Sequence, residues 1–344
     1  MIRVLAALGI ALGLSGPAAV AGNPLRAHYE KPADQWPAPW LDEGVAFVEL
    51  GALLPPPAPP AHLVSLGQRL FFDPRLSVNG QVACASCHRP DQGWTVHTPT
   101  ATGVNGAPGR RNPPGVQDVA SRAHWAWDGA AASLAKQSLR PLTDPREMAN
   151  PSLDAVWQRM RSAPEYAALA KPEQLGEALS AFQRTLHSIS RFDRFAQGEH
   201  RALNDLELQG LHLFRTAARC ANCHHGPTLS DGKFHNLGIA FFGEPSQDLG
   251  RFEVTRQCDD VGRFRTASLR GVSRTAPYMH HGLFDSLQGV LHLYARGGGD
   301  PRNARAGVAT DPLYACAQRV SPHLKPLPLS AADLTALQAF LRSL

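Results

Sequence analysis

Two short motifs with the same pattern contain the residues best suited to chemistry in this chain. They are Cys84-Ala85-Ser86-Cys87-His88 and Cys220-Ala221-Asn222-Cys223-His224. C-x-x-C-H is the attachment sequence of c-type haem: the two thiols bond to the porphyrin, and the histidine becomes an axial ligand of the iron. A redox-active thiol pair or half of a zinc site also contains C-x-x-C, but the first does not need the histidine and the second needs another pair close by. The pattern therefore predicts two covalently bound haems, with His88 and His224 as proximal ligands.

A helix is predicted directly before each motif, where it would position the thiols. Apolar residues recur at helical spacing over residues 63–71, and Asp73-Pro74 ends that pattern before the first motif. Asn204 is a typical N-cap for a second helix, which runs to Phe214 and leads to the second motif. Each helix contains a glycine. This repetition predicts two duplicated cytochrome-c-like domains with a boundary near residue 200.

The remaining sequence predicts further helices joined by long loops. Helical spacing is found over residues 133–139, 153–160, 173–195, 286–294 and 331–344. The segment 89–123 lacks periodicity and predicts one long loop, and the 30 glycines and 29 prolines of the chain favour irregular structure throughout. We therefore expect a mainly α fold of two cytochrome-c-like domains, each binding one covalent c-type haem, with long irregular loops.

The predicted domains follow from these segments. Residues 22–61 are rich in proline and predict an extended lead-in without a fold of its own. Residues 62–199 form the first predicted haem domain and residues 200–344 the second. The last helix is a candidate to pack on the first domain.

An export signal is predicted at residues 1–21. Arg3 precedes a short apolar run, and Ala19-Val20-Ala21 is a small-residue cleavage site. No later segment reaches about 18 consecutive apolar residues, so no membrane span is expected in the mature chain. These features predict an exported, periplasmic protein. In an oxidising compartment the two cysteines outside the motifs, Cys258 and Cys316, are candidates for a disulfide, although the sequence does not show that they meet.

The charge balance of the chain is mildly basic. The formal net charge is +5 and the pI is about 9.0. Such a balance suits an acidic protein partner, but a basic surface without a specific role explains it equally well. Dense Lys/Arg runs with neighbouring aromatic residues are absent from the sequence, which argues against a nucleic-acid partner.

The order of several further motifs resembles the bacterial di-haem cytochrome c peroxidase superfamily, in particular its MauG-like branch. The resemblance covers residue 62 to the C-terminus. The segments that carry it besides the two C-x-x-C-H motifs are Leu70-Phe71-Phe72-Asp73-Pro74-Arg75-Leu76-Ser77, Trp127-Asp128-Gly129, Ser133-Leu134-Ala135-Lys136-Gln137, Pro141, Glu147-Met148, Phe234-His235-Asn236-Leu237-Gly238, Gly262-Arg263-Phe264-Arg265-Thr266, Ser268-Leu269-Arg270, Thr275-Ala276-Pro277-Tyr278-Met279-His280 and Tyr294. This resemblance implies a peroxidatic first domain and an electron-transferring second domain.

Three residues receive roles from the resemblance. Glu147 matches the family's distal carboxylate, which moves a proton between the two oxygens of peroxide. Gln137 is expected to line the same pocket. Trp127 matches the tryptophan between the two haems, where an indole ring shortens the electron path. Without the resemblance, Glu147 and Gln137 would be read as surface residues and Trp127 as a core residue.

The expected distal ligands distinguish the branches of the superfamily. Classical members place a histidine on the loop after the first motif, but the corresponding residues 101–106 contain none, and His97 lies closer to the motif. The first haem is therefore expected to keep an open sixth position without reductive activation. For the second haem, Tyr294 matches the position of the distal ligand, and tyrosine is the choice of MauG-like members. Met279 is the competing candidate.

The resemblance also implies a metal ion and reaction partners. Asn112, Thr275 and Pro277 match the family's calcium site between the domains, and their side-chain and carbonyl oxygens suit Ca²⁺. The expected function is reduction of H₂O₂ at the first haem, with electrons relayed through the second from a small cytochrome c or a cupredoxin. A MauG-like enzyme that oxidises side chains of a partner protein is the alternative, and a non-enzymatic di-haem electron carrier is a second alternative.

Overall fold

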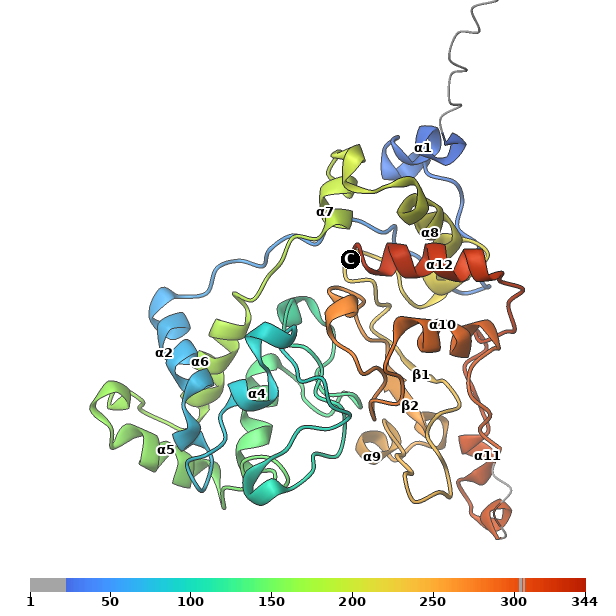
Figure 1. The fold of residues 1–344 in the computed structure, drawn as a ribbon. Coiled ribbons are helices and arrows are strands. Elements are labelled where there is room, and N and C mark those ends of the chain that lie inside the picture. Colours follow the sequence, from blue (N-terminus) through green and yellow to red (C-terminus); the bar gives the residue numbers. More distant parts are fainter. Residues whose placement is uncertain (1–22, 303–304, 306) are drawn as a thin grey trace, which may run out of the picture.

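The computed structural model describes residues 23–302, 305 and 307–344; the predicted signal at residues 1–21 lies outside them. The described chain is mainly helical, with one two-stranded sheet (Figure 1). Its helices are α1 (Pro24–Tyr29), α2 (Ala61–Phe72), α3 (Cys84–Cys87), α4 (Leu134–Thr143), α5 (Leu153–Arg161), α6 (Glu173–Gln183), α7 (Arg191–Ala196), α8 (Asp205–Arg215), α9 (Phe252–Thr255), α10 (Leu287–Ala295), α11 (Tyr314–Ala317) and α12 (Ala331–Leu341). None of these helices is long and apolar enough to cross a membrane.

The first half of the molecule is built on the crossing of α2 and α6 (Figure 1). Gly67 of α2 lies where the backbone of α6 comes closest: a Cβ at residue 67 would lie 1.8 Å from the carbonyl oxygen of Ala178. Next to this crossing the ring centroids of Phe71 and Phe182 are 5.2 Å apart. Only glycine permits such an approach. The crossing therefore fixes the helix that leads into the first motif.

The second half repeats this crossing with α8 and α12. A Cβ at Gly210 of α8 would lie 2.0 Å from the carbonyl oxygen of Ala336, and the rings of Phe214 and Phe340 pack 5.3 Å apart. The predicted duplication therefore has a structural counterpart. The last helix packs on α8 and α10, and α12 covers α8 as α6 covers α2. It also contacts the end of the predicted first domain, because the rings of Phe340 and Phe192 lie 5.5 Å apart.

The lead-in is more structured than the extended segment predicted for residues 22–61. Pro24–Tyr29 forms α1, which packs on α8, and Tyr29 and Trp36 are buried in the core of the second half. The Tyr29 hydroxyl lies 3.0 Å from Nδ1 of His212 in α8. This part of the lead-in therefore belongs to the second half.

The helix predicted over residues 173–195 is two separate helices. The first, α6, ends at Gln183, and α7 begins at Arg191 after the N-cap Ser190. The chain crosses between the two cores in this interval, and Phe192 is already buried in the second core. The cores thus divide a few residues before the predicted boundary at 199/200.

The other predictions of helices and loops agree with the structure apart from shifts at their ends. Short 3-10 turns are the only helical pieces in the predicted loop 89–123. Beyond the second motif, β1 (Phe234–Asn236) pairs antiparallel with β2 (Arg263–Arg265). The disulfide between Cys258 and Cys316 is present, which confirms the pairing considered from the sequence.

A buried ion-pair network joins the two halves. The Arg111 guanidinium donates to Asp128 on its own side (2.6 Å) and to Asp248 on the other side (2.6 and 2.7 Å). Both carboxylates are less than 9% exposed. Removing one member of such a network leaves a buried charge unpaired, so the network fixes how the halves meet.

Candidate functional site

The first motif forms a short helix that points its histidine inward. Cys84 and Cys87 lie on α3, one turn apart, and Ser86 Oγ accepts a hydrogen bond from the Ala83 backbone at the start of that turn (3.0 Å). Nδ1 of His88 lies 3.2 Å from the Trp94 carbonyl oxygen. As a donor to that carbonyl, Nδ1 holds the proton and leaves the lone pair of Nε2 for a metal. Burial lowers the pKa of His88 to about 4, which keeps the ring neutral as an iron ligand must be.

The second motif has the same design. Nδ1 of His224 lies 3.0 Å from the Leu229 carbonyl oxygen, and burial lowers the pKa of His224. The lead-in braces this motif, because Asn222 accepts a hydrogen bond from the Asp42 backbone (2.7 Å) and donates one to the Trp40 carbonyl (3.1 Å). Cys220, Cys223 and His224 open on a large cavity whose walls come from both halves of the molecule. Neutral imidazoles with a free Nε2 next to paired thiols fit a c-type haem at each motif.

Glu147 follows α4 on a turn held by backbone hydrogen bonds. Its N–H donates to the Asp144 carbonyl (3.0 Å), and its carbonyl accepts from Val104 of the long loop (2.9 Å). Burial, with the nearby charge of Asp144, raises the pKa of Glu147 to about 7, and Arg140 opposes this only in part. Burial is the main cause that raises the pKa of Cys84 and Cys87, and the charge of Glu147 adds to it at both thiols. The carboxyl therefore lies within electrostatic range of the first motif.

Gln137 lies on α4, one turn after the N-cap Ser133. Its Oε1 is buried and has no hydrogen-bond partner among the described residues. A buried acceptor without a partner is costly unless a bound group satisfies it. Gln137 and Glu147 are thus polar groups carried by the same helix and the turn that follows it.

The loop over residues 101–106 packs directly on the Glu147 turn. A Cβ at Gly103 would lie 2.1 Å from the carbonyl oxygen of Arg146. His97 is exposed on the surface, and its Nε2 lies 3.2 Å from the Arg274 carbonyl oxygen. The loop therefore supports the turn that carries Glu147, and His97 is engaged elsewhere.

Trp127 lies between the two halves. Its indole Nε1 donates to the Asn112 carbonyl (2.8 Å), and its backbone carbonyl accepts from the N–H of Arg265 in β2 (2.9 Å). The Arg265 guanidinium lies 5.3 Å from the centre of the indole ring, a cation–π distance. Trp127 also lines the cavity that contains the second motif. The structure thus places Trp127 on the wall of the cavity that contains the second motif.

Tyr294 and Met279 both line the cavity around the second motif. Burial raises the pKa of the Tyr294 hydroxyl, and the nearby Cys223 and Cys220 raise it further, so the phenol lies within electrostatic range of both thiols. Its hydroxyl has no hydrogen bond to any described residue.

The segment that carries Tyr294 repeats the segment that carries Gln137. An isolated bridge between Trp125 and Ala131 precedes α4, and an equivalent bridge between Tyr278 and Phe284 precedes α10. In each segment the residue after the first bridge partner has a positive φ, and so does the glycine three residues later: Ala126 and Gly129 in the first, Met279 and Gly282 in the second. The serine two residues after the second bridge partner caps the helix, Ser133 for α4 and Ser286 for α10. When the two segments are aligned on these features, Met279 corresponds to Ala126, and Tyr294 corresponds to Pro141.

The three candidate calcium ligands lie on the wall of the same cavity. Asn112 is buried, and its amide nitrogen donates to the carbonyls of Thr98 and Pro99 (3.2 Å each), which leaves Oδ1 without a hydrogen bond among the described residues. Thr275 and Pro277 line the cavity beside it. The structure therefore gathers these oxygen-bearing residues from both halves.

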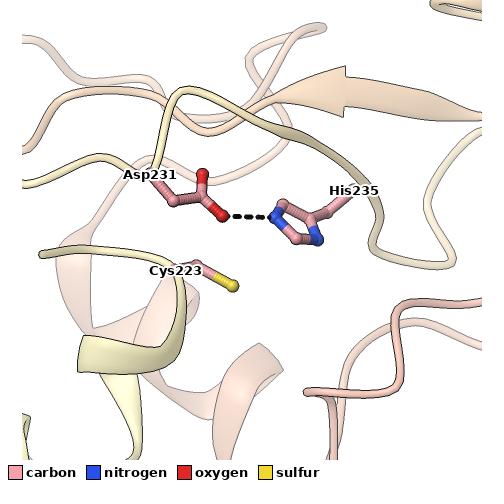
Figure 2. A group of neighbouring side chains, drawn as sticks. All are labelled: Cys223, Asp231 and His235. Carbon is pink, nitrogen blue, oxygen red and sulfur yellow. Dashed lines mark hydrogen bonds and ion pairs between the residues drawn. The ribbon is translucent and has the colours of Figure 1, made fainter. Parts of the chain in front are cut away.

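One further group of metal-ligand type lies beside the second motif. Cys223 Sγ, a carboxylate oxygen of Asp231 and a ring nitrogen of His235 lie within 4.8 Å of one another (Figure 2). His235 Nε2 lies 2.8 Å from Asp231. Burial alone would raise the pKa of Asp231, but the hydrogen bond with His235 and the charge of that ring lower it to about 2. Because Cys223 belongs to the attachment motif, we read the Asp231–His235 pair as part of the wall of the haem cavity.

Comparison with known proteins identifies the family. A family model described as di-haem cytochrome c peroxidase matches residues 61–201. Over 294 residues the chain is 37% identical to the methylamine utilization protein MauG of Methylorubrum extorquens, an alignment that covers 82% of this chain and 77% of MauG. The chain belongs to the di-haem cytochrome c peroxidase family.

Other members of the di-haem cytochrome c peroxidase family are similar over most of the chain. Cytochrome-c peroxidase IdrP1 of Pseudomonas sp. is 32% identical, with 87% of this chain and 86% of IdrP1 covered. The crystal structure of the diheme peroxidase BthA from Burkholderia thailandensis superposes with a TM-score of 0.72 at 25% identity, covering 91% of this chain and 94% of BthA. The protein is accordingly a di-haem peroxidase, and its family implies two c-type haems and H₂O₂ as the electron acceptor.

Two arginines on the wall of the cavity were not predicted from the sequence. Arg122 and Arg265 both line the cavity around the second motif. Arg265 falls within a segment that resembles the family, but nothing in the pattern distinguishes it from a surface arginine. Only the fold reveals that the two approach each other.

Proposed function

We propose that the protein is an exported peroxidase that reduces H₂O₂ at the haem of the first motif, without prior reduction, and draws electrons through the haem of the second. Cys84, Cys87, Cys220 and Cys223 attach the two haems, and His88 and His224 are the proximal ligands. When bound, the haems supply the iron that takes up peroxide and the electrons that reduce it. Export to the periplasm is supported by the disulfide, which forms in oxidising compartments.

The observation that carries this proposal is the state of Glu147. A general acid–base group works best when its pKa is close to the working pH, and burial raises the pKa of this carboxyl to about 7. The carboxylate of Glu147 accepts the proton from the near oxygen of peroxide and returns it to the far oxygen, which leaves as water. Gln137 would orient the peroxide, whose O–H can donate to the buried Oε1 that otherwise has no partner among the described residues.

Two features support an open sixth position at the first haem. His97 is exposed and engaged with a backbone carbonyl, so it does not serve as a cap. The position that corresponds to Tyr294 in the first half is Pro141, whose ring has no donor atom for iron. We propose Tyr294, rather than Met279, as the distal ligand of the second haem.

Trp127 and the calcium site connect the two halves in this proposal. Trp127 hydrogen-bonds to Asn112 and stacks under Arg265, so its ring is held rigidly between the halves and offers an electron path. Asn112 Oδ1 and the carbonyls of Thr275 and Pro277 would hold Ca²⁺ between the halves. The electrons come from a small cytochrome c or a cupredoxin.

The proposal is tested by mixing the fully oxidised protein with H₂O₂ and recording the Soret band in a stopped-flow spectrometer. Fast spectral change without a reductant supports an open first haem, and change only after one-electron reduction contradicts it. The variant Glu147→Gln should slow the reaction, whereas the control Glu177→Gln, on the exposed face of α6, should not.

A second candidate function is oxidation of side chains on a partner protein, as in MauG-like enzymes. It is supported by the place of Tyr294 in the second cavity, because a phenolate ligand favours the oxidised iron more than a thioether does. The 37% identity to a MauG protein points the same way. Rapid turnover with a reduced small cytochrome c favours the first candidate, and slow turnover with a long-lived oxidised state favours the second.

A further inference from the structure

Two arginines between the halves, the buried Arg265 and the partly buried Arg122, have no carboxylate partner among the described residues. Arg265 is 6% exposed, and its only side-chain hydrogen bond to a described residue runs from Nε to the Ala126 carbonyl (2.9 Å). Arg122 donates from Nη2 to the carbonyl of Gly115 and more weakly to that of Gln117, and its buried Nε has no partner in the described part of the chain. Burying guanidinium nitrogens without a carboxylate partner is costly, so the two side chains together require an explanation.

Three other arginines with little exposure each have the carboxylate partner that Arg122 and Arg265 lack. Arg111, Arg215 and Arg270 each form an ion pair with a carboxylate: Asp128 and Asp248, Glu49, and Asp193 respectively. Among the described residues, neither Arg122 nor Arg265 forms an ion pair. Asp118 acts on Arg122 only at a distance, because its carboxylate is hydrogen-bonded to His187 (2.7 Å) and to the Ser188 backbone (3.3 Å).

Both side chains lie on the route between the two motifs. Arg122 and Arg265 line the cavity that contains Cys223 and His224, and they also line a smaller, adjoining pocket. The charge of Arg122 helps to lower the pKa of His88, so this guanidinium is within electrostatic range of the first motif as well. Burial lowers the pKa of Arg265 to about 9, and repulsion from Arg122 adds to the effect. The space between the motifs is therefore strongly electropositive.

We propose that Arg122 and Arg265 bind the propionate carboxylates of the haems where these enter the space between the two motifs. This inference rests on the proposed binding of haem at both motifs. Propionates are the anionic groups of haem, and a guanidinium fork matches a carboxylate in shape and charge. The ion pairs compensate the burial of both arginines. Because a positive charge near iron favours the reduced state, the pair also raises the reduction potential of the nearer haem and couples the two haems through one electrostatic site.

The test uses the matured full-length protein with two haems. Arg122→Leu and Arg265→Leu are compared with Arg302→Leu, which removes the same charge at a side chain that is 78% exposed. Potentials are measured by spectroelectrochemistry, and propionate contacts by the propionate bending bands in resonance Raman spectra. Each buried variant should shift the reduction equilibrium of at least one haem about tenfold toward the oxidised form, which is about 59 mV, and should move a propionate band.

Lysine variants cover the case in which a leucine variant does not mature. Arg265→Lys and Arg122→Lys keep the charge but lose the fork, so the potentials should stay near those of the wild type while the propionate bands shift. Potentials and bands that match the Arg302→Leu control in both series would overturn the proposal. The readouts do not involve peroxide, so a failure here is distinct from a failure of the proposed peroxidase activity.

Discussion

Replacing Glu147 by glutamine tests both the electrostatics and the chemistry of the first site. Burial raises the pKa of this carboxyl from 4.5 to about 7, so the ionised form in the folded chain is disfavoured by about 3 kcal/mol. A group whose pKa rises on folding contributes most to stability below its unfolded pKa, and this contribution is lost as the pH rises through about 7. Glutamine is neutral at every pH. Relative to the wild type, Glu147→Gln should therefore gain up to about 3 kcal/mol of unfolding free energy between pH 4.5 and pH 8.5.

The same variant should lose peroxide reactivity. Because the carboxylate must accept a proton, the second-order rate with H₂O₂ in the wild type should rise with pH through a midpoint near 7. General acid–base catalysis contributes about 10²- to 10⁴-fold, so Glu147→Gln should be slower by that factor and should lack this pH dependence. Stopped-flow rates and chemical denaturation from pH 4.5 to 8.5, with Glu177→Gln as the control, measure both effects. The reasoning is refuted if Glu147→Gln retains the pH midpoint, or if its stability follows the wild type at every pH.

Three further predictions concern the second half and the junction. Tyr294→Met should raise the potential of the second haem by more than about 0.1 V in a redox titration, within the range of about 0.8 V that axial ligands cover, and an unchanged value would exclude Tyr294 as a ligand. Removal of calcium with EGTA should lower the unfolding free energy by about 2.7 kcal/mol relative to protein in a free calcium concentration of a hundred times the Kd, and Asn112→Ala should abolish this response to calcium. The double variant Cys258→Ser, Cys316→Ser opens a loop of 58 residues, which in the chain-entropy model lowers the unfolding free energy by about 4 kcal/mol; denaturation curves that match the wild type would contradict this.

The sequence predicts the helices well where apolar residues repeat with helical spacing over several turns. The helix before each motif and the capped helices at Ser133, Ser286 and Ser330 are of this kind. The lead-in was not predicted correctly, because Tyr29 and Trp36 stand alone in a proline-rich segment. Their burial depends on α8, about 180 residues further along the chain, and no local pattern reports such a contact.

In the candidate site, too, residues marked by a local pattern could be predicted and residues placed by long-range contacts could not. The attachment residues are identified by their own spacing, and Glu147 and Trp127 by their order within a resemblance. Arg122 and Arg265 have no such signal, because an arginine is predicted to be exposed unless its partner is known. They lie where the two halves meet, Arg265 buried and Arg122 partly buried, and no described acidic residue forms an ion pair with either. A cofactor carboxylate is not part of the amino-acid sequence, so no sequence pattern marks the residues that would bind it.

The duplicated scaffold offers a physical reason for two haems with different tasks. In each half a helix with a glycine at the contact point crosses a second helix, and phenylalanine rings pack beside the crossing. Each half also contains an isolated bridge, a glycine turn and a serine-capped helix in that order. At equivalent positions of that last helix the first half has Pro141 and the second has Tyr294. We infer that the two sites differ because a ring without a donor atom leaves the iron free on one side, while a phenol occupies it on the other. The turn after α4 carries Glu147, whose carboxyl would serve the first haem, so we expect a short stretch of each half to separate peroxide chemistry from electron storage.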